Sequence, residues 1–213
     1  MTFKWSVLFT VLSAAAMAIS ASAAVWVVDD DGPIYDFRII QDAVDAASDG
    51  DQIYVMPGVY SESSRPVINF NGKMIEIIGT MEDTILKQQG PHAVVQAIQL
   101  EAPGTLLFGF TLTGGQESGL ITASDIKVVN CLIENNIGDV AGGVFAWIYG
   151  NPQFENCIIQ SNHMFDNSPG AGGVYVSGCG VKMVNCTISG NTSVNDAGGF
   201  YIYAADVELE SCS

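Results

Sequence analysis

Basic residues are scarce in this sequence. Its 213 residues include 7 Lys and Arg against 23 Asp and Glu, which gives a formal net charge of −16. Proteins hold the phosphates of nucleic acids with clustered Lys and Arg side chains, so this balance excludes nucleic acid as a partner. An acidic surface is compatible with cation binding, although solubility alone is the simpler explanation.

Long apolar runs are also scarce. The one candidate, residues 7–19, has about 13 residues, and a membrane-spanning helix needs roughly 20. This run follows Lys4 and precedes the triplet Ala21-Ser22-Ala23, which is the pattern of a secretory signal peptide and its cleavage site. We therefore predict that residues 1–23 are removed, that the mature protein is secreted or displayed at the cell surface, and that it keeps no transmembrane segment.

Helical periodicity is missing from most of the chain, and a repeat of short strands takes its place. Four segments align on a cysteine with spacings of 26, 29 and 26 residues, at Cys131, Cys157, Cys186 and Cys212. Five residues after each of the first three cysteines comes an asparagine, at Asn136, Asn162 and Asn191. A Gly pair and a short apolar strand follow each asparagine. This period predicts a solenoid of stacked coils.

Side-chain parity predicts the shape of one coil. The positions five and three before each cysteine are apolar and point inward, as do the cysteine and the isoleucine two residues after the first three cysteines. The period of two therefore breaks just before the cysteine, which predicts a bend at Asn130, Asn156, Asn185 and Ser211. Each coil then has three strands that pair in parallel with those of the next coil, and we count about six coils.

The stacked cysteines share one inward position. Their parallel Cβ directions do not favour disulfides, so we expect a column of buried free thiols that pack as small apolar groups. Disulfides are the alternative in a secreted protein. We expect no metal site around His92 or His163, because neither has ligands at a suitable spacing.

The start of the chain differs from the repeats. Apolar residues at positions 39, 40, 43, 44 and 47 predict an amphipathic helix that covers the first layer of the core. We expect Asp36 to cap this helix, Gly50 to end it, and residues 52–55 to form a strand. The last coil stops at Ser213, and we expect the sequence to be part of a longer chain.

Three stretches resemble the opening of pectin-lyase-like right-handed β-helix proteins, namely residues 28–33, 39–47 and 50–60. The Asn-Cys-x-Ile-x-x-Asn and Gly-Gly units resemble bacterial β-helix repeats and those of polymorphic outer-membrane proteins. The resemblance implies an all-β fold, a single-stranded right-handed parallel β-helix with an N-terminal capping α-helix. Residues 24–66 would form the cap, as strand, amphipathic helix and strand, and residues 67–213 the coils.

The catalytic units of such relatives are missing. Pectate lyases use an Arg base with Ca²⁺, whereas the only Arg residues here are Arg38 and Arg65, both near the predicted cap. The Gly-His-Gly and Arg-Ile-Lys units of polygalacturonases do not occur, and neither does the Asp-Phe-Ile-Phe-Gly segment of pectin methylesterases. The one Gln-Asp pair, Gln41-Asp42, lies in the predicted cap helix. No catalytic residue can therefore be named, and whether the chain is an enzyme stays open.

Aromatic residues follow each Gly pair and are candidates for carbohydrate binding. If the aliphatic residues of these strands face inward, an outward stripe results, formed by Phe145, Trp147, Tyr175, Tyr201 and Tyr203. Sugar rings present apolar faces that stack on aromatic rings. The alternative is that the rings pair across strands and only stabilise the sheet.

Two sets of acidic residues are considered for cation binding. Asp139, Asp166 and Asp196 lie in the variable loops before the Gly pairs, where stacking could bring carboxylates together for Ca²⁺ or for paired acid chemistry. The alternative is that they are ordinary turn residues. Asp29-Asp30-Asp31 resembles a Ca²⁺ loop only superficially, since it lacks spaced ligands, and we interpret it as a polar surface turn.

Two functions remain in view. The first is a secreted or surface β-helix that binds polysaccharide or another surface partner without catalysis. The second is a polysaccharide-active enzyme of the pectate lyase, polygalacturonase or pectin esterase type, with its site outside this sequence or poorly marked in it. A basic residue or paired carboxylates on one exposed strand face would favour the enzyme.

Overall fold

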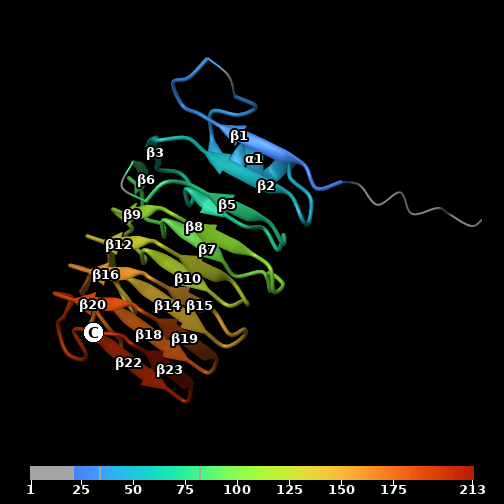
Figure 1. Cartoon of the computed structure of the whole chain (residues 1–213). Helices are drawn as coiled ribbons and strands as arrows, with labels where there is room; N and C mark the ends of the chain where they lie inside the picture. The colour runs from blue at the N-terminus through green and yellow to red at the C-terminus, as the bar shows by residue number, and fades with distance from the viewer. Residues whose placement is uncertain (1–21, 34, 82) are drawn as a thin grey trace, which may run out of the picture.

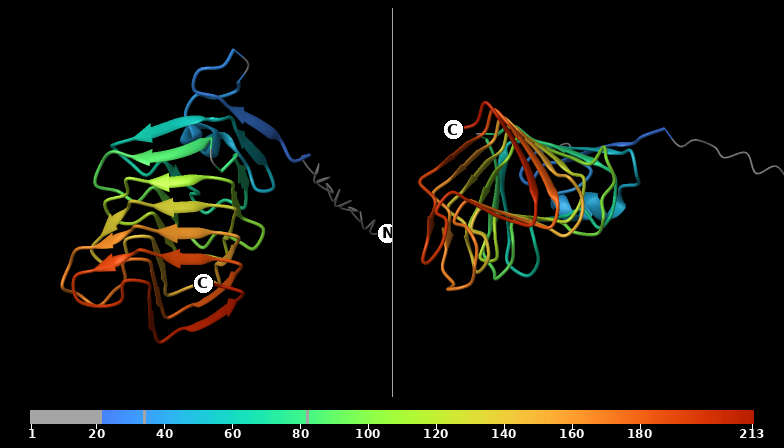
Figure 2. Two further views of the ribbon diagram at one scale, coloured as in Figure 1. Left: turned by 60° about the vertical axis from the view of Figure 1, so that its left-hand side comes forward. Right: turned by 90° about the horizontal axis from the view of Figure 1, so that it is seen from below.

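The computed structural model describes residues 22–33, 35–81 and 83–213. It is an all-parallel right-handed β-solenoid of about seven turns with one short helix, which confirms the predicted fold with one turn more than the sequence count (Figure 1). Seen along the solenoid axis, successive coils lie over one another with a gradual rotation (Figure 2). The predicted signal peptide lies outside the described residues, apart from Ser22 and Ala23.

Three long sheets form the walls of the solenoid. The first sheet contains β1 (Val25–Val28), β2 (Gln52–Val55), β5 (Glu76–Ile78), β8 (Leu106–Phe108), β11 (Lys127–Val129), β15 (Gln153–Glu155), β19 (Gly180–Val184) and β23 (Asp206–Glu210). The second sheet contains β4 (Ile68–Asn69), β7 (Val95–Ala97), β10 (Leu120–Thr122), β14 (Val144–Trp147), β18 (Val174–Ser177) and β22 (Phe200–Tyr203). The third sheet contains β3 (Gly58–Glu62), β6 (Thr84–Gln88), β9 (Thr111–Thr113), β12 (Leu132–Glu134), β16 (Ile158–Gln160) and β20 (Thr187–Ser189).

The predicted bends connect the first sheet to the third. Asn130, Asn156, Asn185 and Ser211 all have left-handed backbone, with φ values of 51°, 53°, 53° and 54°. The N–H groups of the three asparagines donate to carbonyl groups of the next coil at 2.9–3.0 Å. In this conformation the backbone N–H groups keep their hydrogen bonds. The bend also changes which alternate side chains point inward, as the sequence pattern predicted.

A fourth, short sheet was not predicted. It contains β13 (Ile137–Gly138), β17 (His163–Met164) and β21 (Thr192–Ser193). The asparagine before each strand points into the core, and Asn136 and Asn162 are buried. The Oδ1 atom of Asn162 accepts hydrogen bonds at 3.0 Å from both the backbone N–H and the Nδ2 atom of Asn136. Asn191 accepts from Asn162 in the same way, at 2.9 and 3.0 Å.

The Gly pairs make room for this asparagine ladder. A Cβ atom at Gly143 would lie 2.5 Å from the carbonyl oxygen of Gly173 and 3.0 Å from Nδ2 of Asn162. Only glycine allows the coils to approach so closely at this corner. The repeated Gly pair therefore belongs to the scaffold.

The cysteine column is buried as predicted at its first three members, whereas Cys212, in the last described coil, is only partly buried. Cys131, Cys157 and Cys186 are at most 1% exposed, and all are free thiols. Each of these thiols donates to the carbonyl group two residues earlier at 3.4 Å. Burial raises the pKa of the Cys131 thiol to about 12, so this group stays protonated and unreactive.

The cap helix α1 (Ile40–Ala46) packs beneath β1 and β2, and its buried residues are Ile40, Gln41, Ala43 and Val44. It is shorter than predicted, because Ile39 is the N-cap residue and is 48% exposed. The prediction that Asp36 caps the helix is wrong, since its Oδ2 atom accepts from the N–H of Val27 at 2.8 Å. In the described part of the chain, no helix is long and apolar enough to cross a membrane.

The helix also ends earlier than Gly50. The Nζ atom of Lys73, from the next coil, donates to the carbonyl groups of Val44, Asp45 and Ala47 at 2.7–2.8 Å. A lysine is suited to this place, because carbonyl groups at a helix C-terminus lack partners and carry partial negative charge. This contact fixes the cap to the first coils.

Candidate functional site

The outer face of the second sheet carries the predicted aromatic stripe. Along β14 and β18, Val144, Ala146, Val174 and Val176 are buried, while Phe145, Trp147 and Tyr175 are half-buried and face outward. Phe145, Tyr175 and Tyr201 are direct partners across β14, β18 and β22, and Tyr203 is 62% exposed. The alternation of the strand residues therefore predicted the orientation of these side chains.

The rings also contact one another. The centroids of Phe145 and Tyr175 are 5.4 Å apart with planes at 6°, which is an offset stack along the solenoid axis. Tyr201 packs edge-on against Tyr175 at 5.3 Å and 63°, and Trp147 lies 5.8 Å from Phe145 at 17°. These contacts stabilise the sheet, as the structural alternative required. Among the rings of this stripe, Tyr203 is the most exposed.

Trp147 has a further property. Its indole Nε1 is the one buried side-chain nitrogen or oxygen, within the described ranges, that has no hydrogen-bond partner. Buried polar groups normally have a partner, and those without one often lie at functional positions. The indole N–H is therefore a donor without an acceptor on the outer face of the second sheet.

A groove adjoins the C-terminal ends of β14, β18 and β22. It consists of three adjoining hollows of about 430, 370 and 550 Å³ that share Asn151 in their walls. The first of these hollows is lined by residues that directly follow the three strands, including Ile148, Tyr149, Gly178 and Ala204. Tyr149 is 62% exposed. The groove therefore continues the aromatic face toward the first sheet.

The charged residues of the groove walls are mainly acidic. The acidic residues in these walls are Glu76, Asp125, Asp206 and Glu208. Both lysines of the groove are engaged, since Lys127 lies 2.8 Å from Glu155 and Lys182 lies 2.8 Å from Glu210 and 3.3 Å from Glu208. Sequence reasoning missed this groove, although the residues between the Gly-pair strand and the following strand of each repeat could have pointed to it.

The three loop aspartates do not form the cation site that stacking suggested. Over the described residues, they belong to no group of three or more potential ligands whose atoms lie within 4.8 Å of one another. Asp166 instead accepts hydrogen bonds from Ser168 Oγ at 2.8 Å and from the N–H of Asn167 at 2.7 Å, which lower its pKa. Asp196 accepts from the N–H of Gly170 at 3.2 Å, and Asp139 is exposed. Asp166 and Asp196 therefore accept hydrogen bonds within their own loop or from a neighbouring loop.

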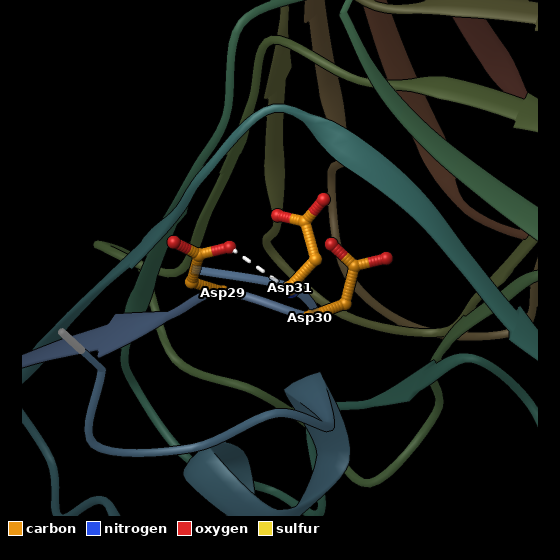
Figure 3. A group of neighbouring side chains, drawn as sticks. All are labelled: Asp29, Asp30 and Asp31. Atoms are coloured by element: carbon orange, nitrogen blue, oxygen red, sulfur yellow. Dashed lines mark hydrogen bonds between the residues drawn. The ribbon is translucent and has the colours of Figure 1, made fainter. Parts of the chain in front are cut away.

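A close group of carboxylates lies elsewhere, in the turn after β1. One oxygen from each of Asp29, Asp30 and Asp31 falls within 4.8 Å of the others, and Figure 3 shows all three side chains projecting from this turn. Asp29 Oδ1 accepts from the N–H groups of Asp31 at 3.3 Å and Gly32 at 2.9 Å. These bonds are those of an aspartate-stabilised turn, as the sequence interpretation held.

The fold and this surface define a class of protein. It is a parallel β-solenoid with an outer aromatic face and an open groove rather than an enclosed pocket. A family profile described as "Right handed beta helix region" matches residues 58–213, so the chain belongs to this family. No match was found among curated proteins.

Solved structures share the fold at low identity. The Geobacillus virus E2 ORF18 protein is 14% identical with a TM-score of 0.48, and the match covers 86% of this chain and 48% of the viral one. This chain thus spans about half the length of the viral protein. The deglycosylated pectin methylesterase of Aspergillus niger is 16% identical with a TM-score of 0.41, and the match covers 91% of each chain. A pectin methylesterase in complex with hexasaccharide IV is 15% identical with a TM-score of 0.44, covering 87% of this chain and 66% of that one.

Proposed function

We propose that the protein is exported and binds a neutral polysaccharide, without cleaving it, along the aromatic face and the adjoining groove. The observation that carries this proposal is the in-register row of outward rings on β14, β18 and β22, which runs directly into the groove. Aromatic side chains supply apolar surface and, in Tyr and Trp, a polar group as well. Polysaccharide binding needs this combination on an open surface.

The spacing of the coils suits an extended polymer. Coils of a parallel solenoid repeat at about 4.8 Å, which is close to the length of one sugar residue in a chain. A glycan that lies along the solenoid axis therefore meets an equivalent position on every coil. Tyr203 and Tyr149 are the rings with most accessible area, each 62% exposed, and they supply the apolar contacts at the end of the row.

The charge of the groove selects against acidic polymers. Its lysines are held by glutamates, including Glu208 of the groove itself. Among the described residues, the other three acidic groove residues, Glu76, Asp125 and Asp206, have no ion-pair partner and face any ligand. A polyuronate would meet like charge over several sugars, which raises the free energy of binding. Neutral glycans avoid this repulsion and use the carboxylates as hydrogen-bond acceptors.

One ion pair beside the groove is poorly suited to acid–base catalysis. A general acid for glycosidic bond cleavage needs a raised pKa at neutral pH. The pKa of Glu210, on the outer face of β23 beside the groove, is lowered instead by its hydrogen bond from Lys182. Lys182 in turn has a raised pKa because it binds Glu210 and Glu208, which makes it a poor base.

Titration with defined hexasaccharides tests this proposal. Isothermal titration would use neutral β-1,4-linked glucose, mannose and xylose hexamers, with hexagalacturonate as the acidic comparison. We expect at least one neutral hexamer to bind, and Tyr203→Ala to weaken this binding about tenfold, or about 1.4 kcal/mol. Tyr54→Ala is the matched control, because Tyr54 is 40% exposed on the outer face of the first sheet, and it should leave binding unchanged.

Three results would contradict the proposal. The first is that none of the three neutral hexamers binds. The second is equal weakening by Tyr203→Ala and Tyr54→Ala, which would place the site elsewhere. The third is the appearance of new reducing ends during incubation, which would favour the polysaccharide-active enzyme.

A further inference from the structure

Of the residues that the structure describes, Ala24 is the first whose backbone is hydrogen-bonded on both sides. Its N–H donates to Oδ1 of Asp51 at 2.7 Å, and its carbonyl accepts from the N–H of Gln52 at 2.9 Å. The two residues before it, Ser22 and Ala23, are exposed. The first coil therefore begins at Ala24, the residue that follows the cleavage triplet Ala21-Ser22-Ala23.

Asp51 is a buried carboxylate held in one orientation. It is 6% exposed, and its Oδ2 atom accepts from the N–H of Ser48 at 2.9 Å and from Nε1 of Trp26 at 3.2 Å. These hydrogen bonds, with that of Ala24 and the more distant positive charge of Lys73, lower its pKa and keep the group ionised at neutral pH.

This anion has no direct ion-pair partner. Among the described residues, no Lys, Arg or His nitrogen lies within 4.0 Å of the Asp51 carboxylate. A buried charge without a partner is costly, because hydrogen bonds replace only part of its lost hydration. The position nearest to it that can become cationic is the backbone nitrogen of Ala24.

We propose that removal of residues 1–23 converts this nitrogen into an α-ammonium group that pairs with Asp51 and completes the first coil. The step is hydrolysis by a signal peptidase: the Ala23–Ala24 peptide bond breaks, and water gives a carboxylate to Ala23 and an ammonium to Ala24. The hydrogen bond at 2.7 Å then becomes charge-assisted and about twice as strong. This inference rests on the export of the protein and not on glycan binding.

Two measurements test the processing and the ion pair. The full chain is expressed in a secreting bacterial host, and intact mass should show Ala24 as the first residue of the exported protein. The α-amine is then labelled with an acylating reagent across a pH series. Pairing with Asp51 raises the pKa of this amine, so native protein should label about tenfold or more slowly at pH 7 than urea-unfolded protein. The labelling curve should also move to higher pH.

Two variants separate the ion pair from simple burial. Asp51→Asn should return the labelling curve to that of the unfolded chain. Trp26→Phe removes another donor from the same carboxylate, keeps the ammonium, and should leave the curve shifted. A first residue other than Ala24 in the exported protein would overturn the processing. A native wild-type curve that is lowered but not shifted in pH would overturn the ion pair, and this result does not depend on whether Asp51→Asn folds.

Discussion

The asparagine ladder provides the most direct test of what holds the coils together. Asn162 is 1% exposed, and its side chain takes part in four hydrogen bonds. Oδ1 accepts twice from Asn136 at 3.0 Å, and Nδ2 donates to the Ile133 carbonyl at 2.9 Å and to Asn191 Oδ1 at 3.0 Å. We expect Asn162→Ala to lower the free energy of unfolding substantially.

The magnitude follows from the groups that lose partners. In Asn162→Ala, the N–H of Asn136 and the carbonyl of Ile133 each lose the bond that Asn162 makes with them. Each buried group left unpaired costs about 1–3 kcal/mol, so the two together predict a loss of about 2–6 kcal/mol. A domain has only about 5–15 kcal/mol of net stability, so much of it would be lost.

Urea unfolding followed by circular dichroism measures this loss as a lower midpoint. Asn195→Ala is the matched control, because Asn195 is exposed and its side chain binds only Asn167 in a neighbouring loop. We expect the control to change stability by less than about 0.5 kcal/mol. A loss below about 1 kcal/mol for Asn162→Ala would refute the reasoning, since it would mean that water replaces the ladder at little cost.

Four further predictions concern the core and the cap. Cys157→Ser should destabilise the fold by about 1–3 kcal/mol in urea unfolding, because a hydroxyl loses more hydration on burial than a thiol. The five cysteines should all titrate as free thiols in unfolded, unreduced protein, while Cys131 stays unreactive in the native state; finding disulfides would contradict both. Lys73→Met should cost about 1.5–3 kcal/mol by exposing three helix carbonyls without a donor, whereas Lys87→Met, at an exposed position, should change the urea midpoint little. Asp51 has a lowered pKa in the native state, so its contribution to stability is present above its ordinary pKa of 3.8 and lost as the pH falls through the lower native pKa. The urea midpoints of wild type and Asp51→Asn should therefore converge as the pH falls below 3.8.

The repeat was predictable because each coil carries the same alternation of inward and outward residues. Parity alone placed the bend at Asn130 and its equivalents, since only a reversal of direction puts both flanking apolar sets inside. The same argument oriented Phe145 and Tyr175, because a strand has just two faces. Local periodicity decides these features, and it is fully present in the sequence.

Contacts between distant residues could not be predicted in this way. The hydrogen bonds from Lys73 to the helix end join residues that are 26 to 29 positions apart, and no sequence pattern near residue 46 indicates them. Asp36 fits the composition of a helix cap, yet it bonds to Val27 because β1 lies beside it. The groove likewise arises from turns of successive coils that no single repeat contains.

The Gly-pair corner has a consequence for how such a chain changes in evolution. Each coil touches only its two neighbours, and the asparagine and glycine positions recur at the same corner of every repeat. A duplication of one whole repeat would therefore add a coil without disturbing the others, and would lengthen the outer surface by about 4.8 Å. The segments between the asparagine and the Gly pair differ in length from coil to coil, although each begins with a strand of the fourth sheet. Gene duplication can thus set the length of the solenoid, while the segments between the asparagine and the Gly pair vary independently of that length.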